Sequence, residues 1–365
     1  MTLTAPAPAL LVLEDGSVFE GEMVAPGTRF GEVVFNTSMT GYQEILTDPS
    51  YRGQLVVLTQ PHQGNYGVHD AFDESRQPWA EGLIARQVTP TPARGEALTP
   101  WLRRHRLPAI AGIDTRALVR RLRVQGALRG VVTSERSEVE ALVREVKDFP
   151  SMEGRALVDE VTAGAERILE PEGPPRCAVA VYDFGVKENI LRCLRARGAR
   201  VHVLPARTPA QRCQELGVHG VVLSNGPGDP AALPDLVGTV KELAHGELPV
   251  LGICLGHQLL GLALGAKTFK LKFGHHGGNQ PVRDEATGKV TITSQNHGFA
   301  VDAATLPEGC RVSEINLNDG TLEAFEVADR PIYSAQYHPE AAPGPRDASP
   351  LFDRFLATTV AQAQG

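Results

Sequence analysis

The chain has no apolar run approaching the roughly 18 residues that a helix needs to cross a bilayer. Residues 1–13 carry no basic leader, and their apolar run stops at Glu14 and Asp15. We therefore expect neither a transmembrane helix nor a secretory signal peptide. The expected place of action is the cytoplasm, with no membrane partner.

Cysteine is also scarce, with five residues in a chain of 365 and no Cys-x-x-Cys pair. An odd and scattered set predicts reduced thiols, at most one of them with special chemistry. No long basic run is present, and 36 lysines and arginines against 43 aspartates and glutamates give a formal charge of −7. Nucleic acid is therefore not an expected partner.

The length predicts about two domains, at roughly 150 residues each. Apolar residues make up 42% and charged residues 22%, which is the balance of an ordinary globular protein. No internal repeat is present. The proline-rich end of residues 151–175 predicts a linker between an N-terminal domain (1–150) and a C-terminal domain (176–365).

The N-terminal domain is expected to be mixed α/β. Apolar runs predict strands at residues 10–13, 33–35 and 54–58. Residues 115–123 have the spacing of a helix that is N-capped near Asp114.

The C-terminal domain begins with alternating strand and helix patterns. Short apolar, β-branched runs predict buried strands at residues 177–182, 200–204, 220–223 and 248–253. Helical spacing followed by glycine predicts helices at residues 187–197 and 209–216. This alternation predicts βαβ units and a mostly parallel sheet. Closely spaced strands after residue 289, at 290–293 and 332–336, are expected to pair antiparallel at the edge.

One cysteine has the setting of a nucleophile. Cys254 follows an apolar strand and precedes a helix, within a Gly-x-Cys-x-Gly motif formed with Gly252 and Gly256. This motif is the sulfur counterpart of a nucleophile elbow, in which flanking glycines relieve clashes at a sharp turn. The helix N-terminus favours a thiolate, and the Leu255 N–H points to a developing oxyanion. Outside this setting, a buried structural cysteine would be the better interpretation.

A thiolate nucleophile needs an oriented base, and His338 is the strongest candidate among eleven histidines. It directly follows a predicted strand, where α/β sheets collect their active sites. Glu340 lies two residues later, so in extended chain the two side chains share a side and the carboxylate can hold the imidazole tautomer. The competing interpretation is a surface His-Pro-Glu turn.

Together these motifs resemble the Cys-His-Glu triad of class I glutamine amidotransferases. The loop at residues 224–230, Ser-Asn-Gly-Pro-Gly-Asp-Pro, is also similar to theirs. The resemblance implies that a backbone N–H of this loop completes the oxyanion hole, which gives Gly226 and Gly228 a role beyond that of a simple turn.

Further segments resemble the small subunits of carbamoyl-phosphate synthetases, in order along nearly the whole chain. They are residues 35–51 (Phe-Asn-Thr-Ser-Met-Thr-Gly-Tyr and onward), 112–118, 272–279 and 295–299. The resemblance implies contacts to L-glutamine by Ser50 of the N-terminal domain, for which a common Asp-Pro-Ser turn is the alternative. It also implies contacts by residues of the amidotransferase domain: Gly226, Gly228, Leu255, Gln258, Asn296, Gly298 and Phe299.

Two other binding patterns are rejected. His275 and His276 are adjacent, so their side chains diverge on a strand, and no third ligand is spaced to form a metal site. Residues 261–268 nearly spell a phosphate-binding loop, but Ala266 replaces the second glycine and the segment follows a helix rather than a strand. We expect no metal and no cofactor in this chain, with ATP and Mg on a large subunit.

The predicted function is glutamine hydrolysis for a carbamoyl-phosphate synthetase, a ligase. The resemblance implies that ammonia passes internally to the large subunit, which makes carbamoyl phosphate from bicarbonate and two ATP. The product serves arginine or pyrimidine biosynthesis, and the sequence does not distinguish the two. The alternatives are a stand-alone cysteine hydrolase, such as a peptidase or γ-glutamyl hydrolase, and a catalytically dead regulatory subunit, against which all three triad residues argue.

Overall fold

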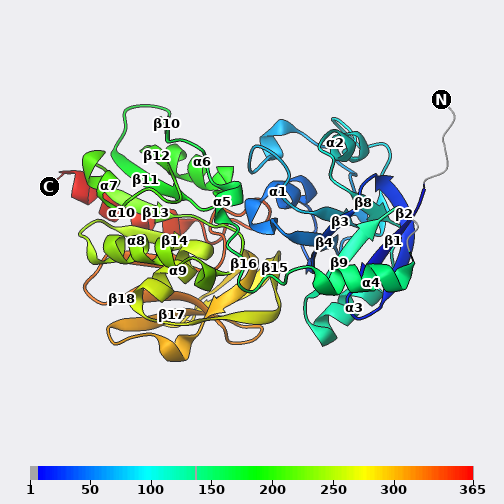
Figure 1. Cartoon of the computed structure of the whole chain (residues 1–365). Coiled ribbons are helices and arrows are strands. Elements are labelled where there is room, and N and C mark those ends of the chain that lie inside the picture. The colour runs from blue at the N-terminus through cyan, green and yellow to red at the C-terminus, as the bar shows by residue number, and fades with distance from the viewer. Residues whose placement is uncertain (1–6, 136–137, 365) are drawn as a thin grey trace. The chain divides into compact units, whose positions relative to one another are not determined.

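A computed structural model describes residues 7–135 and 138–364. Residues 1–6, part of the segment without a basic leader, lie outside the described residues. The chain divides into two compact units, one of residues 1–152 with 272–276, the other of residues 153–271 with 277–365. Figure 1 shows the elements of both. Within the described ranges, no helix is both long and apolar enough to span a membrane.

The N-terminal unit is built on a closed barrel of seven strands in the order β1-β2-β8-β6-β4-β3-β9. Neighbours β3, β4, β6 and β8 run parallel, and the remaining pairs are antiparallel. The strands are β1 (Ala7–Leu13), β2 (Val18–Ala25), β3 (Arg29–Asn36), β4 (Gln54–Leu58), β6 (Gly82–Ile84), β8 (Ala109–Ala111) and β9 (Leu128–Thr133). A short pair, β5 (His62–Gln63) with β7 (Gln87–Val88), lies outside the barrel.

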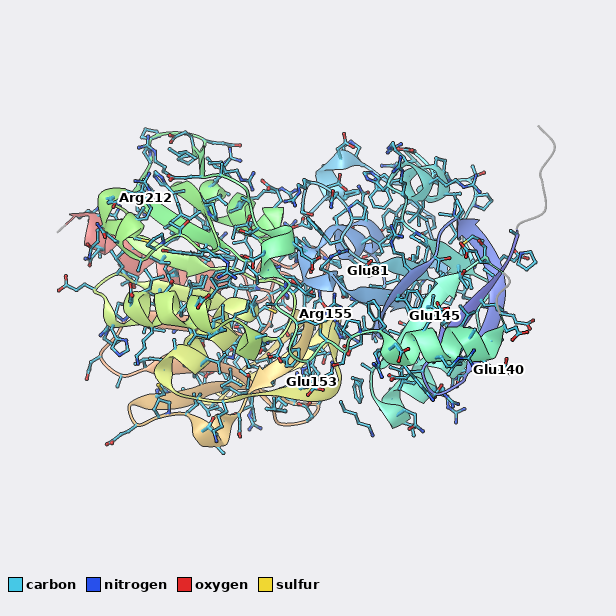
Figure 2. All side chains as sticks on the ribbon, in the orientation of Figure 1. Glu81, Glu140, Glu145, Glu153, Arg155 and Arg212 are labelled. Atoms are coloured by element: carbon cyan, nitrogen blue, oxygen red, sulfur yellow. The ribbon has the colours of Figure 1, made fainter. Side chains whose placement is uncertain are left out.

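Helices complete this unit: α1 (Tyr42–Thr47), α2 (Leu98–Arg104), α3 (Thr115–Gln125) and α4 (Val139–Asp148). Helix α3 begins as predicted, because the Asp114 side chain accepts a hydrogen bond from the Ala117 N–H. Helix α4 buries Leu142 and Val146, four residues apart on one face. Its exposed Glu140 and Glu145 are labelled in Figure 2. The predicted mixed α/β character is confirmed, although no pattern in the sequence had indicated barrel closure.

The C-terminal unit is built on a six-stranded sheet in the order β10-β12-β11-β13-β14-β19. All neighbours are parallel except β10, which is antiparallel to β12. The strands are β10 (Arg167–Leu169), β11 (Cys177–Asp183), β12 (Ala199–Pro205), β13 (Gly220–Leu223), β14 (Val250–Ile253) and β19 (Ile332–Ala335). The predicted parallel sheet is thus confirmed.

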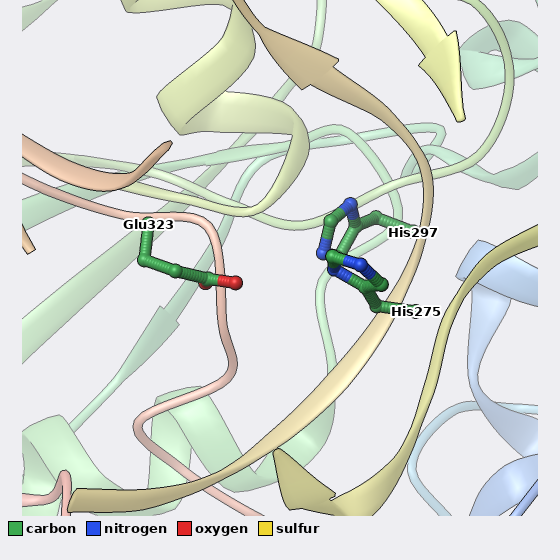
Figure 3. Close-up of side chains that lie close together, drawn as sticks. All are labelled: His275, His297 and Glu323. Atoms are coloured by element: carbon green, nitrogen blue, oxygen red, sulfur yellow. The ribbon is translucent and has the colours of Figure 1, made fainter. Parts of the chain in front are cut away.

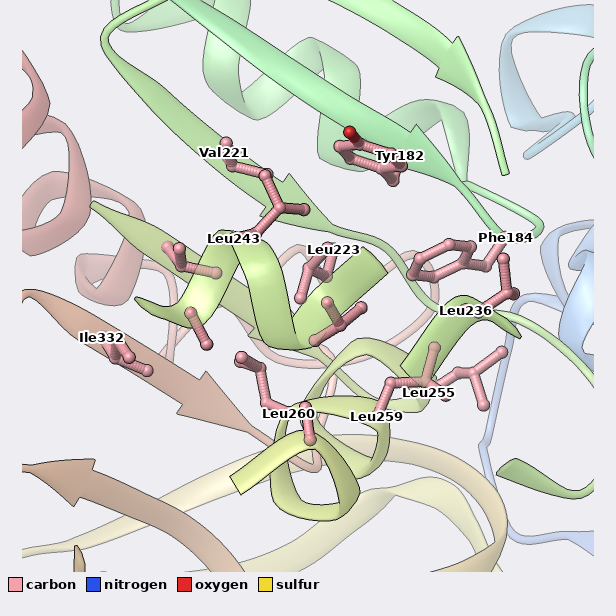
Figure 4. Packing of buried hydrophobic residues seen from close by; sticks show 14 of the residues in the cluster. Tyr182, Phe184, Val221, Leu223, Leu236, Leu243, Leu255, Leu259, Leu260 and Ile332 are labelled. Atoms are coloured by element: carbon pink, nitrogen blue, oxygen red, sulfur yellow. The ribbon is translucent and has the colours of Figure 1, made fainter. Parts of the chain in front are cut away.

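Helices cover both faces of this sheet. On one face, α8 (Pro234–His245) and α9 (Leu255–Leu264) pack with alternate strand residues such as Tyr182 and Leu223 (Figure 4). The other face packs against α6 (Glu188–Ala196) and α10 (Pro350–Gln364), with Val181 and Val222 pointing to it. A short helix, α7 (Gln211–Glu215), follows β12. Burial on both faces explains why these strands are continuous apolar runs.

Two expectations about this unit were wrong. Residues 332–335 do not pair antiparallel: β19 runs parallel to β14 and extends the main sheet, because a long excursion returns the chain in the same direction. The segment 151–175 is not a bare linker, since it contains α5 (Val158–Val161) and β10. The dense prolines, Pro171, Pro174 and Pro175, come after β10 and do not prevent it from pairing with β12.

The excursion between α9 and β19 forms a second, four-stranded sheet in the order β16-β15-β17-β18. Its strands are β15 (Thr268–Asp284), β16 (Val290–Val301), β17 (Cys310–Asn316) and β18 (Leu322–Val327). Residues 272–276 of β15 group with the N-terminal unit. The strand predicted at 290–293 is therefore the start of a much longer one.

Candidate active site

Cys254 occupies a strained turn between β14 and α9. Its φ is +52° and its ψ is −104°, a conformation that residues with a Cβ rarely adopt. A Cβ on Gly256 would lie 2.1 Å from the Leu223 carbonyl oxygen, and a Cβ on Gly252 would lie 2.5 Å from a Leu260 methyl. Glycine is therefore required at both positions, and the turn can form only in this sequence context.

The structure brings the three predicted triad residues together. His338 and Glu340 follow β19, the strand next to β14, and the Cys254 N–H donates to the Ala335 carbonyl at 2.8 Å. Nδ1 of His338 lies 2.7 Å from Oε1 of Glu340, and all three side chains are buried. The Cys254 thiol also donates a hydrogen bond to the Asn296 carbonyl oxygen at 3.6 Å.

The electrostatics of the histidine favour its charged form. Burial opposes the imidazolium, but the Glu340 carboxylate, which also contacts the ring, and the neighbouring Cys254 side chain outweigh it and raise the pKa of His338 above its ordinary value. For Glu340, burial opposes ionisation, but Lys187 and His338 outweigh it and lower the pKa of the carboxyl. The shifts favour a charged Glu340 carboxylate and a protonated ring beside it.

Lys187 is a candidate functional residue that the sequence patterns did not indicate. Its Nζ lies 3.0 Å from Oε1 of Glu340, both side chains are buried, and the ammonium also donates to the Ala341 carbonyl. Asn189 Nδ2 donates to the Glu340 carbonyl at 2.5 Å. Lys187 precedes α6, just beyond the carboxyl end of β11, and that position next to a sheet's active edge was the available signal.

The loop at residues 224–230 follows β13, the other neighbour of β14. A Cβ on Gly226 would lie 2.2 Å from the Phe184 carbonyl oxygen, and Gly228 has a φ of +95°. The Gly256 N–H donates to the Ser224 carbonyl at 3.0 Å, which ties this loop to the start of α9.

The Leu255 N–H belongs to the first turn of α9, where no helical carbonyl can accept it. The site thus collects at the carboxyl ends of adjacent parallel strands.

The other predicted glutamine contacts in this unit lie on α9 and β16. Gln258 Nε2 donates to the Phe299 carbonyl at 2.7 Å and to Gln336 Oε1 at 3.1 Å. Asn296 and Phe299 are buried on β16. Gly298 lies between them, and a Cβ added there would meet nothing within 4 Å. The position next to Gly298 is therefore open space.

A buried polar network supports this strand. His297 Nδ1 donates to the Phe299 carbonyl at 2.8 Å, and its Nε2 lies 3.0 Å from Gln295 Oε1. Gln295 Nε2 and Asn316 Nδ2 donate to Glu323 Oε1 at 2.8 and 2.7 Å. Figure 3 shows the side chains of His297 and Glu323. Such hydrogen-bonded networks fix a buried segment in one conformation.

Ser50 belongs to the N-terminal unit. It is buried in a single 3-10 turn (Pro49–Tyr51), and its N–H donates to the Asp48 side chain at 2.9 Å. Its contact with glutamine stays a prediction. His275 and His276 fall in the part of β15 that groups with this same unit, and the absence of a metal there also stays a prediction.

Comparisons with known proteins match both units. The family model "Carbamoyl-phosphate synthase small chain, CPSase domain" matches residues 11–132, and "Glutamine amidotransferase class-I" matches residues 180–358. The carbamoyl phosphate synthase small chain of Xanthomonas campestris pv. campestris is 50% identical, covering 96% of this chain and 98% of its own. That of Thermosynechococcus vestitus is 49% identical, covering 98% of each chain.

The same name belongs to a protein of Escherichia coli K12 that is 48% identical, covering 95% of this chain and 96% of its own. These matches confirm the resemblance inferred from the sequence. The chain belongs to the carbamoyl phosphate synthase small chain family and carries a class I glutamine amidotransferase domain.

Proposed function

We propose that this chain hydrolyses L-glutamine to glutamate and ammonia through a thioester on Cys254, and that it delivers the ammonia to a large subunit. The observation that carries the proposal is the buried contact of His338 with Glu340, 2.7 Å apart, beside a cysteine in a strained strand-to-helix turn. In this proposal ATP, Mg and bicarbonate act only on the large subunit, which makes the carbamoyl phosphate.

The first chemical step is acylation. Sγ of Cys254, its proton held by His338, attacks the side-chain amide carbon of glutamine. The carbonyl oxygen becomes an oxyanion, for which the Leu255 N–H and an N–H of the 226–228 segment are the proposed donors. His338 then gives its proton to the amide nitrogen, the C–N bond breaks, and ammonia leaves a γ-glutamyl thioester.

The second step is deacylation. The ring of His338, now neutral, takes a proton from a water molecule, whose oxygen attacks the thioester carbon. The C–S bond breaks, glutamate leaves, and the thiolate regains its imidazolium partner. Glu340 orients and polarises the imidazole throughout without exchanging a bond with the substrate, and Lys187 in turn holds Glu340.

Substrate recognition is assigned to Gln258, Asn296, Gly298, Phe299 and the glycine loop, together with Ser50. An amino acid with two charged termini suits backbone groups and short polar side chains. Buried polar groups at such a site disfavour analogues that leave them unpaired. The free space at Gly298 supports this assignment.

Glutamate release from glutamine by the complex with the large subunit tests the proposal. Cys254→Ser should lose at least about a hundredfold in rate, because an alcohol is a far weaker nucleophile than a thiolate. Cys310→Ser, which alters a half-buried cysteine on β17 outside the site, serves as the matched control and should keep the parent rate. Parent-level hydrolysis by Cys254→Ser would overturn the assignment.

A further inference from the structure

The N-terminal unit has a cavity of about 660 Å³ that the proposed glutamine chemistry does not use. It lies where β4, β6 and β8 end, since Thr59 follows β4, Arg86 follows β6, and Thr115 follows β8 as the first residue of α3. These strands are parallel neighbours, so their carboxyl ends meet at one edge of the barrel, the usual place for a binding site.

Four arginines line this cavity: Arg86 and, on α3, Arg116, Arg120 and Arg123. The three on α3 are spaced four and three residues apart, so they share one face of the helix. Leu118 and Leu122 of the same helix are buried in the barrel core, which leaves the arginines directed away from it. All four arginines are exposed.

Among residues 7–135 and 138–364, the arginines on this face have no acidic partner, whereas their neighbours do. Arg121 pairs with Asp15 at 2.6 Å, and Arg129 pairs with Glu14. In the described parts of the chain, no ion pair is formed by Arg116, Arg120 or Arg123. The carboxylate of Asp114, also at the cavity, accepts the Ala117 N–H as the cap of α3. A chain with a formal charge of −7 therefore concentrates uncompensated positive charge on one helix face.

We infer that this face, defined by Arg86, Arg116, Arg120 and Arg123, docks acidic side chains of the large subunit. Arg116 to Arg123 spans about 10 Å at the helical rise, which matches several carboxylates along a protein segment. Guanidinium groups bind carboxylates bidentately and favour protein interfaces. Only the identity of the partner rests on the proposed function.

The test measures the dissociation constant of this chain from the large subunit by calorimetry, at low and at high salt. Removing three charges in R116Q/R120Q/R123Q should weaken association at least about tenfold at low salt. It should also reduce the salt dependence, because salt screens attraction between exposed charges. The matched control is R94Q/R106Q/R144Q, which removes three exposed arginines of the same unit and should keep the parent affinity.

Unchanged affinity and salt dependence in R116Q/R120Q/R123Q, with an unchanged circular dichroism spectrum, would overturn docking. A second arm titrates inorganic pyrophosphate. If the parent chain binds pyrophosphate tightly and R116Q/R120Q/R123Q does not, while the variant keeps its affinity for the large subunit, the face is a small-anion site and docking is overturned. Labelling of Cys254 by a glutamine-like electrophile separates the two proposals. The R116Q/R120Q/R123Q variant should still be labelled. Absence of labelling in the parent chain would count against the proposed glutaminase activity but not against docking.

Discussion

The Nζ of Lys187 lies 3.0 Å from Oε1 of Glu340, and both charges are buried beneath the candidate catalytic histidine. A lysine at this depth needs a fixed carboxylate, and the carboxylate in turn holds His338. Lys187 therefore adds a fourth buried side chain, in contact with Glu340, to the candidate triad.

Replacing the lysine by an apolar residue of similar length should leave the Glu340 charge without its second cation. Lys187→Met should destabilise the C-terminal unit by about 3–5 kcal/mol, the usual cost of removing one partner of a buried ion pair. The pKa of Glu340 is lowered in the fold, so its stabilising contribution is present above the unfolded pKa and disappears as pH falls through the folded one.

The difference in denaturant stability between the parent and Lys187→Met should accordingly be largest near neutral pH and shrink in acid. Arg212→Gln, which breaks a surface pair with Glu166 (Arg212 is labelled in Figure 2), is the control and should cost under about 1 kcal/mol. Equal losses from the two variants would show that the lysine is not structurally coupled to the triad.

Glu340→Gln should change the pH dependence of kcat/KM in a defined direction. The carboxylate raises the pKa of His338, so its removal lets the imidazolium lose its proton at lower pH. The basic limb of the profile should move to lower pH. Lys187 acts oppositely on the pKa of His338, so Lys187→Met should move the limb to higher pH. Shifts of the same sign in both variants would contradict this scheme.

The same variant tests the order of importance within the triad. Glu340 exchanges no bond with the substrate, so Glu340→Gln should lose less rate than Cys254→Ala, although the three residues act as a unit. Single-turnover glutamate release at the optimum pH of each variant makes this comparison. Equal losses would place the carboxylate on a level with the nucleophile.

Two glycines provide a matched pair for the turn and the pocket. Gly256→Ala should lose glutaminase activity and cost about 1–3 kcal/mol or more, because the new methyl would meet the Leu223 carbonyl oxygen at 2.1 Å. Gly298→Ala has free space and should keep stability within about 0.5 kcal/mol, while raising KM for glutamine. Thermal unfolding and glutamine titrations measure both effects, and an undisturbed Gly256→Ala variant would contradict the turn geometry.

The isolated chain should be a poor glutaminase that the partner activates. Glutamate release should rise at least about tenfold when the large subunit, bicarbonate and ATP are all present, since misplacement of reacting groups by about 1 Å can cost roughly a hundredfold. In the proposed function, the second substrate that consumes the ammonia is bound by the large subunit. Full activity of the lone chain, unchanged by the partner, would count against this coupling.

The sequence predicted most of what local rules control. The alternation of strand and helix patterns over residues 177–253 predicted the parallel sheet, and the glycines on either side of Cys254 predicted the sharp turn. Both features depend on short-range sterics and burial. Closure of the N-terminal barrel and the parallel pairing of β19 depend on partners far along the chain, which periodicity does not reveal. Lys187 was missed because a lysine before a helix is ordinarily exposed, and its partner Glu340 lies far along the chain.

The most direct test of the central claim is detection of the acyl-enzyme. The complex is mixed with glutamine, quenched in acid within one turnover, digested and examined by mass spectrometry. We predict that the peptide containing Cys254 gains the mass of glutamine less ammonia, and that peptides containing the other four cysteines do not. Glutamate formation without any such adduct, or an adduct on another residue, would contradict the assignment of Cys254 as the nucleophile.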